Sequence, residues 1–599
     1  MQPRTGTLDT ELLSMAERHR AGAGNLASAS LVALARRGAT VLSAALPTMP
    51  SPVALKLIVR AGSEDRVADW VRAQGGEVVS TGHAVLVARL PPDALAGLDK
   101  QPEILRAETP RPMLPRLDQA RGSATGLDRA LVSAPLTGQG VMLGIVDSGA
   151  DWRHDDFRHA DGSTRLELFG FARQAEGTTV SSFSEFDTAA IDAALNGTGQ
   201  VPDGDPNGHG THCLSIAAGT GRASNGEFRG VAPAAALAAV RSEPLLDEHI
   251  IWGIRRIFAL AGSRPAVVSL SLGGHWGPHD GTSAIENVIA KESGPGRIIV
   301  VAAGNEGDEG IHWQGELVGG QDLVVPVRVV DTDLQVIDVW IPRGDAVDVQ
   351  IETQDGARFD PSANRRETVF GAFLADWRID SINGDLNLTL IILNGVLNTR
   401  WFVRFDPQTI RQGIVHAWAI TPNPRTSANI FIDGGGTGFT VGMPGTEERA
   451  ITVASFVSRN SFETASGTFS TPGLQVGGRS PFSSHGPTRI GVLKPDIAAP
   501  GQYVTAALAA DSEMMTDPRF VPRHHPSGRY ISIQGTSMAT PFVAGTVALM
   551  LEREPSLTPE EVQQRLRITA RRDDSTGRVW NIGFGWGKLD AEALLAYQV

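Results

Sequence analysis

The sequence predicts an α/β fold, a three-layer domain with a parallel sheet between helices, interrupted by an inserted antiparallel β-sandwich. Between about residues 125 and 310, and again after 440, short apolar runs alternate with helix-compatible stretches, which is typical of buried parallel strands joined by helices. Between these two parts the alternation stops, and strand-like runs follow one another with little helix. With 599 residues, the chain also exceeds the roughly 250–300 residues that one hydrophobic core supports.

The N-terminal part divides into two segments. Residues 1–52 are rich in Ala and Arg and are predicted to form a helical extension that ends in closely spaced prolines. Residues 53–115 are predicted to form a small separate unit, because strand- and helix-like stretches follow in the order β-α-β-β-α-β of a ferredoxin-like fold. Pro110, Pro112 and Pro115 mark the start of a linker.

The α/β domain is predicted in two parts, residues 120–310 and 441–599. Its strands are nearly continuous apolar runs, as expected for strands that are buried on both faces. These runs are Val141–Asp147, Ala236–Val240, Ala266–Leu272, Ile298–Ala303 and Ala450–Ser455. The predicted helices are His249–Leu260, Thr282–Glu292, a stretch after Ser537, and Thr558–Thr569.

The insertion at residues 311–440 is predicted to be an antiparallel β-sandwich or jelly-roll. Turn residues separate its strand-like runs, and helix signals are scarce. The runs are Leu323–Val330, Gln335–Ile341, Ala346–Thr353, Leu386–Leu393, Trp401–Phe405, Ile414–Ile420 and Asn429–Ile432.

Charge and composition exclude several classes of partner. The formal net charge is −13 and no long basic run occurs, which argues against nucleic acid or an anionic membrane as the main partner. No stretch approaches the roughly 18 apolar residues that a membrane span needs. The first ten residues lack the apolar core of a secretory signal, so a cytoplasmic location is expected, with export by another route left open. Cys213 is the only cysteine, so no intramolecular disulfide can form.

Two short motifs supply a carboxylate and an imidazole. The run GIVDSG places Asp147 at the end of a buried strand, where α/β sheets hold their functional sites, although many strands end in a structural Asp. The run NGHGTHC places His209 between glycines that allow close backbone approach. His209 and His212 could instead bind a metal, but no third ligand with suitable spacing follows, so no metal site is predicted.

Two further motifs supply a hydroxyl and an amide. The run GTSMATP places Ser537 at the start of an apolar helix, where free N–H groups favour developing negative charge. The alternative is a simple helix N-cap serine. The run VVAAGNEG places Asn305 after an apolar strand, where its amide could donate to an oxyanion together with the Ser537 N–H, or merely form a turn.

Together these residue types are what peptide hydrolysis needs. A serine hydroxyl becomes a nucleophile when an imidazole takes its proton, and a carboxylate fixes the tautomer and charge of that imidazole. The motifs, in the order Asp, His, Asn, Ser, resemble those of the subtilisin family of serine proteases over roughly 125–310 and 440–599. Supporting runs are GVAPAA, SLSLGG, FSSHGP and KPDIAAPG.

The resemblance implies a subtilisin-like catalytic domain and endopeptidase activity on proteins or peptides. It implies a triad of Asp147, His209 and Ser537, with His209 rather than His212 as the base, and Asn305 in the oxyanion hole. Substrate would lie as an added strand along Ser271, Leu272 and Gly273.

The same resemblance bears on the other segments and on cofactors. The unit at 53–115 resembles the propeptide of such proteases, a chaperone and inhibitor, so a self-processing zymogen is expected. The β-sandwich insertion resembles that of clostridial germination proteases. No cofactor is required. Calcium is compatible with the family, because Asp156 matches a common ligand position, but no full oxygen-ligand loop can be identified.

The competing hypothesis is a pseudoprotease, or a partner-binding protein held inactive by its propeptide. Because the three triad residues and Asn305 are all present, the sequence favours the active endopeptidase.

Overall fold

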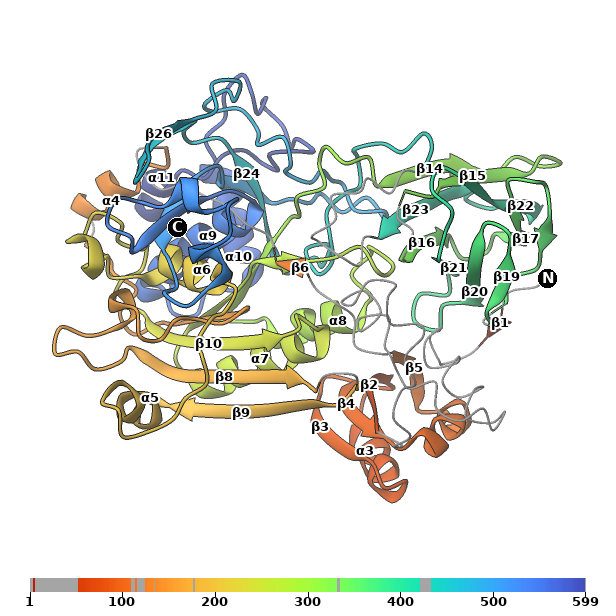
Figure 1. Cartoon of the computed structure of the whole chain (residues 1–599), viewed down its shortest axis with the longest axis horizontal. Helices are drawn as coiled ribbons and strands as arrows, with labels where there is room; N and C mark the ends of the chain where they lie inside the picture. Colours follow the sequence, from red (N-terminus) through yellow and green to blue (C-terminus); the bar gives the residue numbers. More distant parts are fainter. Residues whose placement is uncertain are drawn as a thin grey trace.

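The computed structural model describes residues 4–5, 52–108, 114–115, 124–133, 135–175, 178–330, 334–362, 364–420 and 432–597. A large α/β domain lies at one end of the molecule and a β-sandwich at the other, and a small unit near the N-terminus lies against both (Figure 1). The α/β fold predicted from the sequence is confirmed.

The central sheet of the α/β domain has the strand order β27-β24-β13-β11-β7-β10-β8-β9. Its neighbours pair in parallel except for β8 and β9, which form an antiparallel edge. The sequence analysis did not predict β8 or β9, because their polar and apolar residues are mixed where one face stays partly exposed. The strands are β7 (Met142–Asp147), β8 (Leu166–Gln174), β9 (Ser181–Asp187), β10 (Ala236–Glu243), β11 (Ala266–Leu270), β13 (Arg297–Ala302), β24 (Ile451–Phe456) and β27 (Ile497–Pro500).

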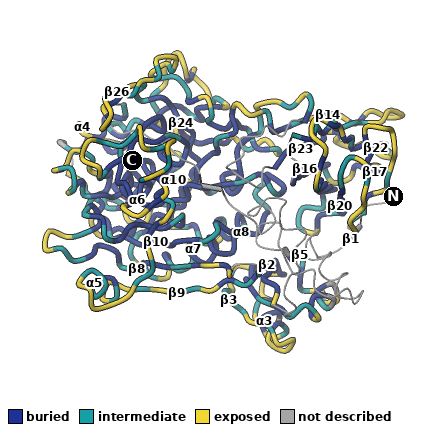
Figure 2. Tube along the Cα trace, viewed as in Figure 1, coloured by how far each residue is buried: buried dark blue, intermediate teal, exposed yellow. Residues whose placement is uncertain are grey.

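Helices cover both faces of this sheet, because successive side chains of each buried strand point to opposite sides. Ile145 shares an apolar cluster with helices α6 and α9, whereas Val146 shares another with α7 and α8. These layers form the continuous buried region in Figure 2. Within the described residues, no helix is both long and apolar enough to cross a membrane. The α-helices of this domain are α4 (Leu127–Ser133), α5 (Thr188–Leu195), α6 (His209–Ala218), α7 (Asp247–Ala261), α8 (Ala284–Glu292), α9 (Thr536–Arg553), α10 (Pro559–Thr569) and α11 (Ala591–Ala596).

Short strand pairs lie outside the central sheet. Strand β12 pairs with β6, β25 with β26, and β28 with β29. Their bounds are β6 (Leu114–Pro115), β12 (Leu272–Gly273), β25 (Ser461–Thr464), β26 (Gly467–Ser470), β28 (Val504–Ala507) and β29 (Tyr530–Ile533).

The N-terminal unit is an antiparallel sheet of order β3-β4-β2-β5 with the ferredoxin-like succession of elements. Its second helix is a 3-10 helix rather than an α-helix. Ile58, Val85 and Val87 share an apolar cluster with α7 and α8, and Lys56 forms a buried ion pair with Asp247 of α7. The elements are β2 (Val53–Val59), α3 (Glu64–Ala73), β3 (Glu77–Gly82), β4 (Val85–Leu90), η2 (Pro92–Lys100) and β5 (Ile104–Glu108).

The helices predicted within residues 1–52 lie outside the described residues. In that range the structure describes only β1 (Arg4–Thr5) and Pro52. Strand β1 pairs in parallel with β20 of the insertion.

The insertion contains two antiparallel sheets with an apolar core between them. One has the order β20-β21-β16-β23-β14, with β19 beside β20, and the other has the order β15-β22-β17-β18. The sequence analysis did not predict β20, because the buried Asp376 and Arg378 interrupt its apolar pattern. Of the run predicted at Asn429–Ile432, only Ile432 is among the described residues. The strands are β14 (His312–Glu316), β15 (Leu323–Arg328), β16 (Leu334–Ile341), β17 (Ala346–Thr353), β18 (Arg358–Phe359), β19 (Arg366–Thr368), β20 (Gly371–Ile379), β21 (Leu386–Leu393), β22 (Arg400–Thr409) and β23 (Ile414–Ile420).

Candidate active site

Asp147 and His209 meet where β7 ends and α6 begins. Asp147 Oδ1 lies 2.5 Å from His209 Nδ1, and both side chains are buried. The same Oδ1 accepts a hydrogen bond from the Ser148 N–H at 2.7 Å. A Cβ atom at Gly210 would come within 2.0 Å of the Gly149 carbonyl oxygen, so this close approach of α6 to the end of β7 requires glycine. The pair has the geometry of a carboxylate that orients an imidazole.

Asp205, which the sequence analysis did not single out, forms hydrogen bonds with the residues next to this pair. Its Oδ1 accepts hydrogen bonds from Ser148 Oγ and from the Gly208 N–H, both at 2.8 Å. Its Oδ2 accepts bonds from the Thr211 N–H at 2.8 Å and from Thr211 Oγ1 at 2.7 Å. Burial raises the pKa of the Asp205 carboxyl, although these four bonds oppose that effect. Asp205 therefore joins the first turn of α6 to the residue after Asp147.

Ser537 lies in the first turn of α9, beside the Ser271 backbone. Ser537 Oγ donates to the Ser271 carbonyl at 3.1 Å, and Ser271 Oγ donates to the Ser537 carbonyl at 2.8 Å. Cys213 lies between Ser537 and His209. Its Sγ is 3.5 Å from the Ser537 carbonyl oxygen and 3.8 Å from His209 Nε2. The three residues predicted as a triad are thus brought together by β7, α6 and α9.

Asn305 follows β13 and is fixed next to Ser537. Its Oδ1 accepts hydrogen bonds from the Thr536 N–H and from Thr536 Oγ1, each at 2.9 Å. These two bonds orient the side-chain amide, so that its Nδ2 donor faces away from Thr536. Thr536 is a second contributor that the sequence analysis did not identify, since only the fold reveals its contact with a residue 231 positions away.

The residues predicted to bind substrate pair with a short strand of the N-terminal linker. Leu272 lies opposite Pro115 and Gly273 opposite Leu114 in an antiparallel pairing of β12 with β6. The mode of binding predicted for an extended substrate is therefore adopted here by the chain itself.

The two histidines of the NGHGTHC motif differ in electrostatic environment. Burial lowers the pKa of His209, but the attraction of the Asp147 carboxylate and the contacts with Cys213 outweigh burial, and its pKa is well above the usual value. Burial lowers the pKa of His212 to about 3, and its Nε2 lies 3.1 Å from the Ile531 carbonyl oxygen. His212 is therefore a neutral structural residue, and His209 is the one placed for proton transfer.

The raised pKa of His209 predicts a pH–rate profile shifted to higher pH. The base must be neutral, so kcat/KM should rise with pH to a midpoint above the reference value of about 6.5. Because the folded-state pKa exceeds the unfolded one, the stabilisation from this pair is complete below about pH 6.5 and is lost as pH rises through the folded-state pKa. An NMR titration of His209 in Ser537→Ala would measure that pKa, and Asp147→Asn should lower it. A midpoint at or below 6.5 would contradict the prediction.

The described residues contain one cluster of candidate metal ligands. Among the described residues, only Asp147, His209 and Cys213 bring three candidate ligand atoms within 4.8 Å of one another. The Asp156 carboxylate, at the position where the resemblance suggested a calcium ligand, accepts hydrogen bonds from Tyr530 Oη at 2.8 Å and from the Ala223 N–H at 3.2 Å.

Cys213 offers a direct test of the site geometry. Its Sγ lies 3.8 Å from His209 Nε2 and 3.9 Å from Nδ1, as expected from the i, i+4 spacing in α6. Burial raises the pKa of its thiol, so bulky alkylating agents should react slowly. Mercuric chloride should nevertheless inhibit hydrolysis by binding Sγ and displacing the imidazole, whereas Cys213→Ala should resist it. Equal sensitivity of the two proteins, measured as residual peptidase activity, would refute this arrangement.

Comparison with known proteins gives a consistent picture. A model described as the subtilase family matches residues 138–325 and 406–587, more than half of the chain. Serine protease AprX of Bacillus subtilis is 33% identical over 158 residues, which are 26% of this chain and 31% of that protein. Subtilisin-like protease SBT2.4 of Arabidopsis thaliana is 24% identical over 541 residues, which are 74% of this chain and 60% of that protein. The chain thus spans less than two thirds of the length of these relatives.

A solved structure supports the fold. The Clostridium perfringens CspB protease superposes with a TM-score of 0.64 and 23% identity, covering 79% of this chain and 96% of that chain.

Proposed function

The chain belongs to the subtilase family, and from this premise we propose that it is a serine endopeptidase that hydrolyses peptide bonds in proteins. Ser537 is the nucleophile, His209 the general base and Asp147 the residue that orients the base. The observation that carries this proposal is the convergence of these residues, with His209 bound to Asp147 and Cys213 in contact with both His209 and Ser537. The presence of the complete set argues against a pseudoprotease.

The reaction follows from these positions. Ser537 Oγ leaves the Ser271 carbonyl, attacks the substrate carbonyl carbon and passes its proton to His209 Nε2, while Asp147 stabilises the imidazolium. The oxyanion accepts hydrogen bonds from Asn305 Nδ2 and from the Ser537 N–H. His209 then protonates the leaving amine, which departs and leaves an acyl-enzyme. Water, deprotonated by His209, attacks the ester and releases the acid and the free Ser537 hydroxyl.

The N-terminal unit is proposed to be an inhibitory propeptide that the enzyme removes itself. Strand β6 pairs with β12, where an extended substrate is expected to bind, and Pro115 lies opposite Leu272. The antiparallel pairing directs the end of β6 toward Ser271, whose carbonyl accepts the Ser537 hydroxyl. We therefore expect the cut within the linker, between about Arg111 and Thr125.

This expectation is tested by intact-mass analysis and N-terminal sequencing. Wild-type protein should yield a catalytic chain whose N-terminus lies between about Arg111 and Thr125, and Ser537→Ala should stay uncut. A fully active protein with an intact linker would show that the unit is not an inhibitory propeptide. Labelling of wild-type protein by a fluorophosphonate tests the nucleophile independently of processing.

A further inference from the structure

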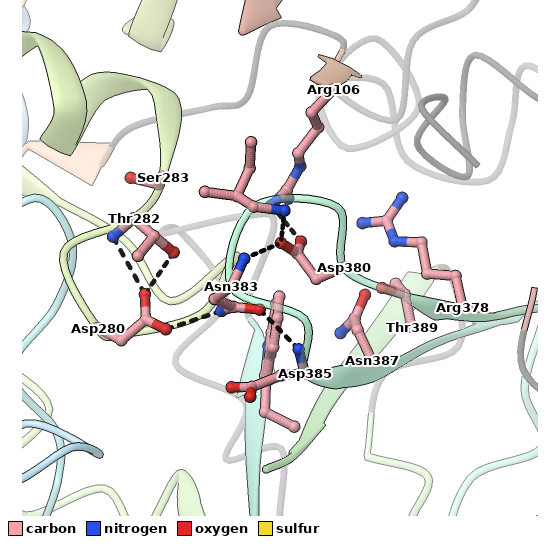
Figure 3. A network of polar contacts seen from close by, with 12 residues as sticks. Arg106, Asp280, Thr282, Ser283, Arg378, Asp380, Asn383, Asp385, Asn387 and Thr389 are labelled. Carbon is pink, nitrogen blue, oxygen red and sulfur yellow. Dashed lines mark hydrogen bonds and ion pairs between the residues drawn. The ribbon is translucent and has the colours of Figure 1, made fainter. Parts of the chain in front are cut away.

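The turn between β20 and β21, residues 380–385, presents a buried carboxylate to the N-terminal unit (Figure 3). Asp380 Oδ1 accepts hydrogen bonds from the Ile382 N–H at 2.8 Å and from the Asn383 N–H at 3.2 Å. Asp380 Oδ2 forms an ion pair with Arg106 of β5. Arg106 and Asp380 are each only 2% exposed. The turn therefore holds Asp380 in place for a cation supplied by another part of the chain.

The same turn is also bound to the catalytic domain. Asn383 Nδ2 donates to Asp280 Oδ2 at 2.8 Å, in the loop that follows β12. Arg489 bridges the two parts, since its guanidinium lies 2.7 Å from Asp280 and 2.7 Å from Asp385. Residues 380–385 consequently have a fixed position relative to the active site even without the N-terminal unit.

The N-terminal unit also contacts α7, α8 and the segment around β9. Lys56 pairs with Asp247, and Arg255 donates to Ser80 Oγ at 2.6 Å and to the Gly82 carbonyl at 2.6 Å. Arg106 lies on β5, at the edge of the unit's sheet, so its ion pair is a second and separate attachment. Strand β1 adds to the same side of the insertion, where it pairs with β20 up to Ile379.

We propose that the β-sandwich insertion is a second docking surface for the N-terminal unit, and that Asp380 recognises Arg106 and keeps the unit bound after the linker is cut. Release of the unit must break this buried ion pair before both charges regain water, which makes release slow. Retention after cleavage rests on the proposed self-processing, whereas the docking contact itself does not.

The test is a double-mutant cycle in the full chain with Arg106→Gln, Asp380→Asn and the combined variant. After cleavage, release of the N-terminal fragment is followed by size exclusion with intact-mass detection. Each single variant should release it roughly 10²–10³-fold faster, because removing one partner of a buried ion pair is strongly unfavourable. The combined variant should be no faster than the faster single variant. Arg72→Gln is the matched control, since Arg72 is an exposed arginine on α3 of the same unit.

A second measurement separates docking from processing. In uncut Ser537→Ala protein, Arg106→Gln and Asp380→Asn should each raise hydrogen exchange in β5 and in residues 380–385, so the contact is testable even if no cleavage occurs. Asparagine retains an oxygen that can accept the Ile382 N–H, which preserves the turn, and Arg106→Lys should partly restore slow release. Release and exchange rates equal to those of Arg72→Gln would overturn the proposal. So would faster exchange in the insertion with unchanged release, which would make the pair a structural brace.

Discussion

Replacing Ser537 by alanine is expected to lower kcat by roughly 10⁶-fold, the loss typical of a nucleophile that acts as one unit with its base. His209→Ala should cause nearly the same loss, and the double variant should be little worse than either. The cause is chemical, because without Oγ no acyl-enzyme forms. The residual hydrolysis would come from substrate binding and the oxyanion donors alone.

The fold should survive this change, which separates catalysis from stability. Within the described part of the chain, the Ser537 side chain donates one hydrogen bond, to the Ser271 carbonyl. Such a bond contributes about 1 kcal/mol to the free energy of unfolding. Ser271→Ala is the matched control, because it removes a hydroxyl that donates to the Ser537 carbonyl but performs no chemistry. Peptide turnover and fluorophosphonate labelling measure the effect, and thermal unfolding verifies the fold. Undiminished turnover by Ser537→Ala would invalidate the mechanism.

The residues of the proposed site could be predicted from the sequence where the neighbouring residues in the chain indicate the local structure. Asp147 ends an apolar strand, His209 stands between glycines that permit close packing, and Ser537 starts a long apolar helix. Asp205 and Thr536 were not identified. Each acts through a contact that exists only once β7, α6, β13 and α9 have assembled, so the local sequence contains no signal for it.

The same distinction applies to the fold: elements with a clear local pattern were predicted, whereas contacts between residues distant in the sequence were not. Strands buried on both faces, such as β11 and β13, appear as plain apolar runs. Strand β20 was missed because it buries the charged residues Asp376 and Arg378, which form an ion pair with each other. The pair Arg106–Asp380 joins residues 274 positions apart, and the pairing of β6 with β12 likewise depends on the assembled domain. Neither could be deduced from composition or periodicity.

Asn305→Ala should lower kcat by roughly 10²–10³-fold while KM changes little. An oxyanion donor acts mainly in the transition state, and its loss raises the barrier by about 2.7–4 kcal/mol. The structure specifies how the donor is held, because Asn305 Oδ1 accepts two hydrogen bonds from Thr536 and the amide nitrogen is thereby turned away from that residue.

This arrangement makes Thr536→Val a discriminating companion variant. It removes the hydroxyl that donates to Asn305 Oδ1 but keeps the backbone N–H that also donates to it, so kcat should fall by much less than in Asn305→Ala. Asn305→Asp should behave like the alanine variant or worse, because a carboxylate cannot donate and would repel the oxyanion. Steady-state kcat and KM on one peptide substrate give the comparison. A loss confined to KM in Asn305→Ala would mean that Asn305 binds the ground state, and the Ser537 N–H would then be the only remaining oxyanion donor among those proposed here.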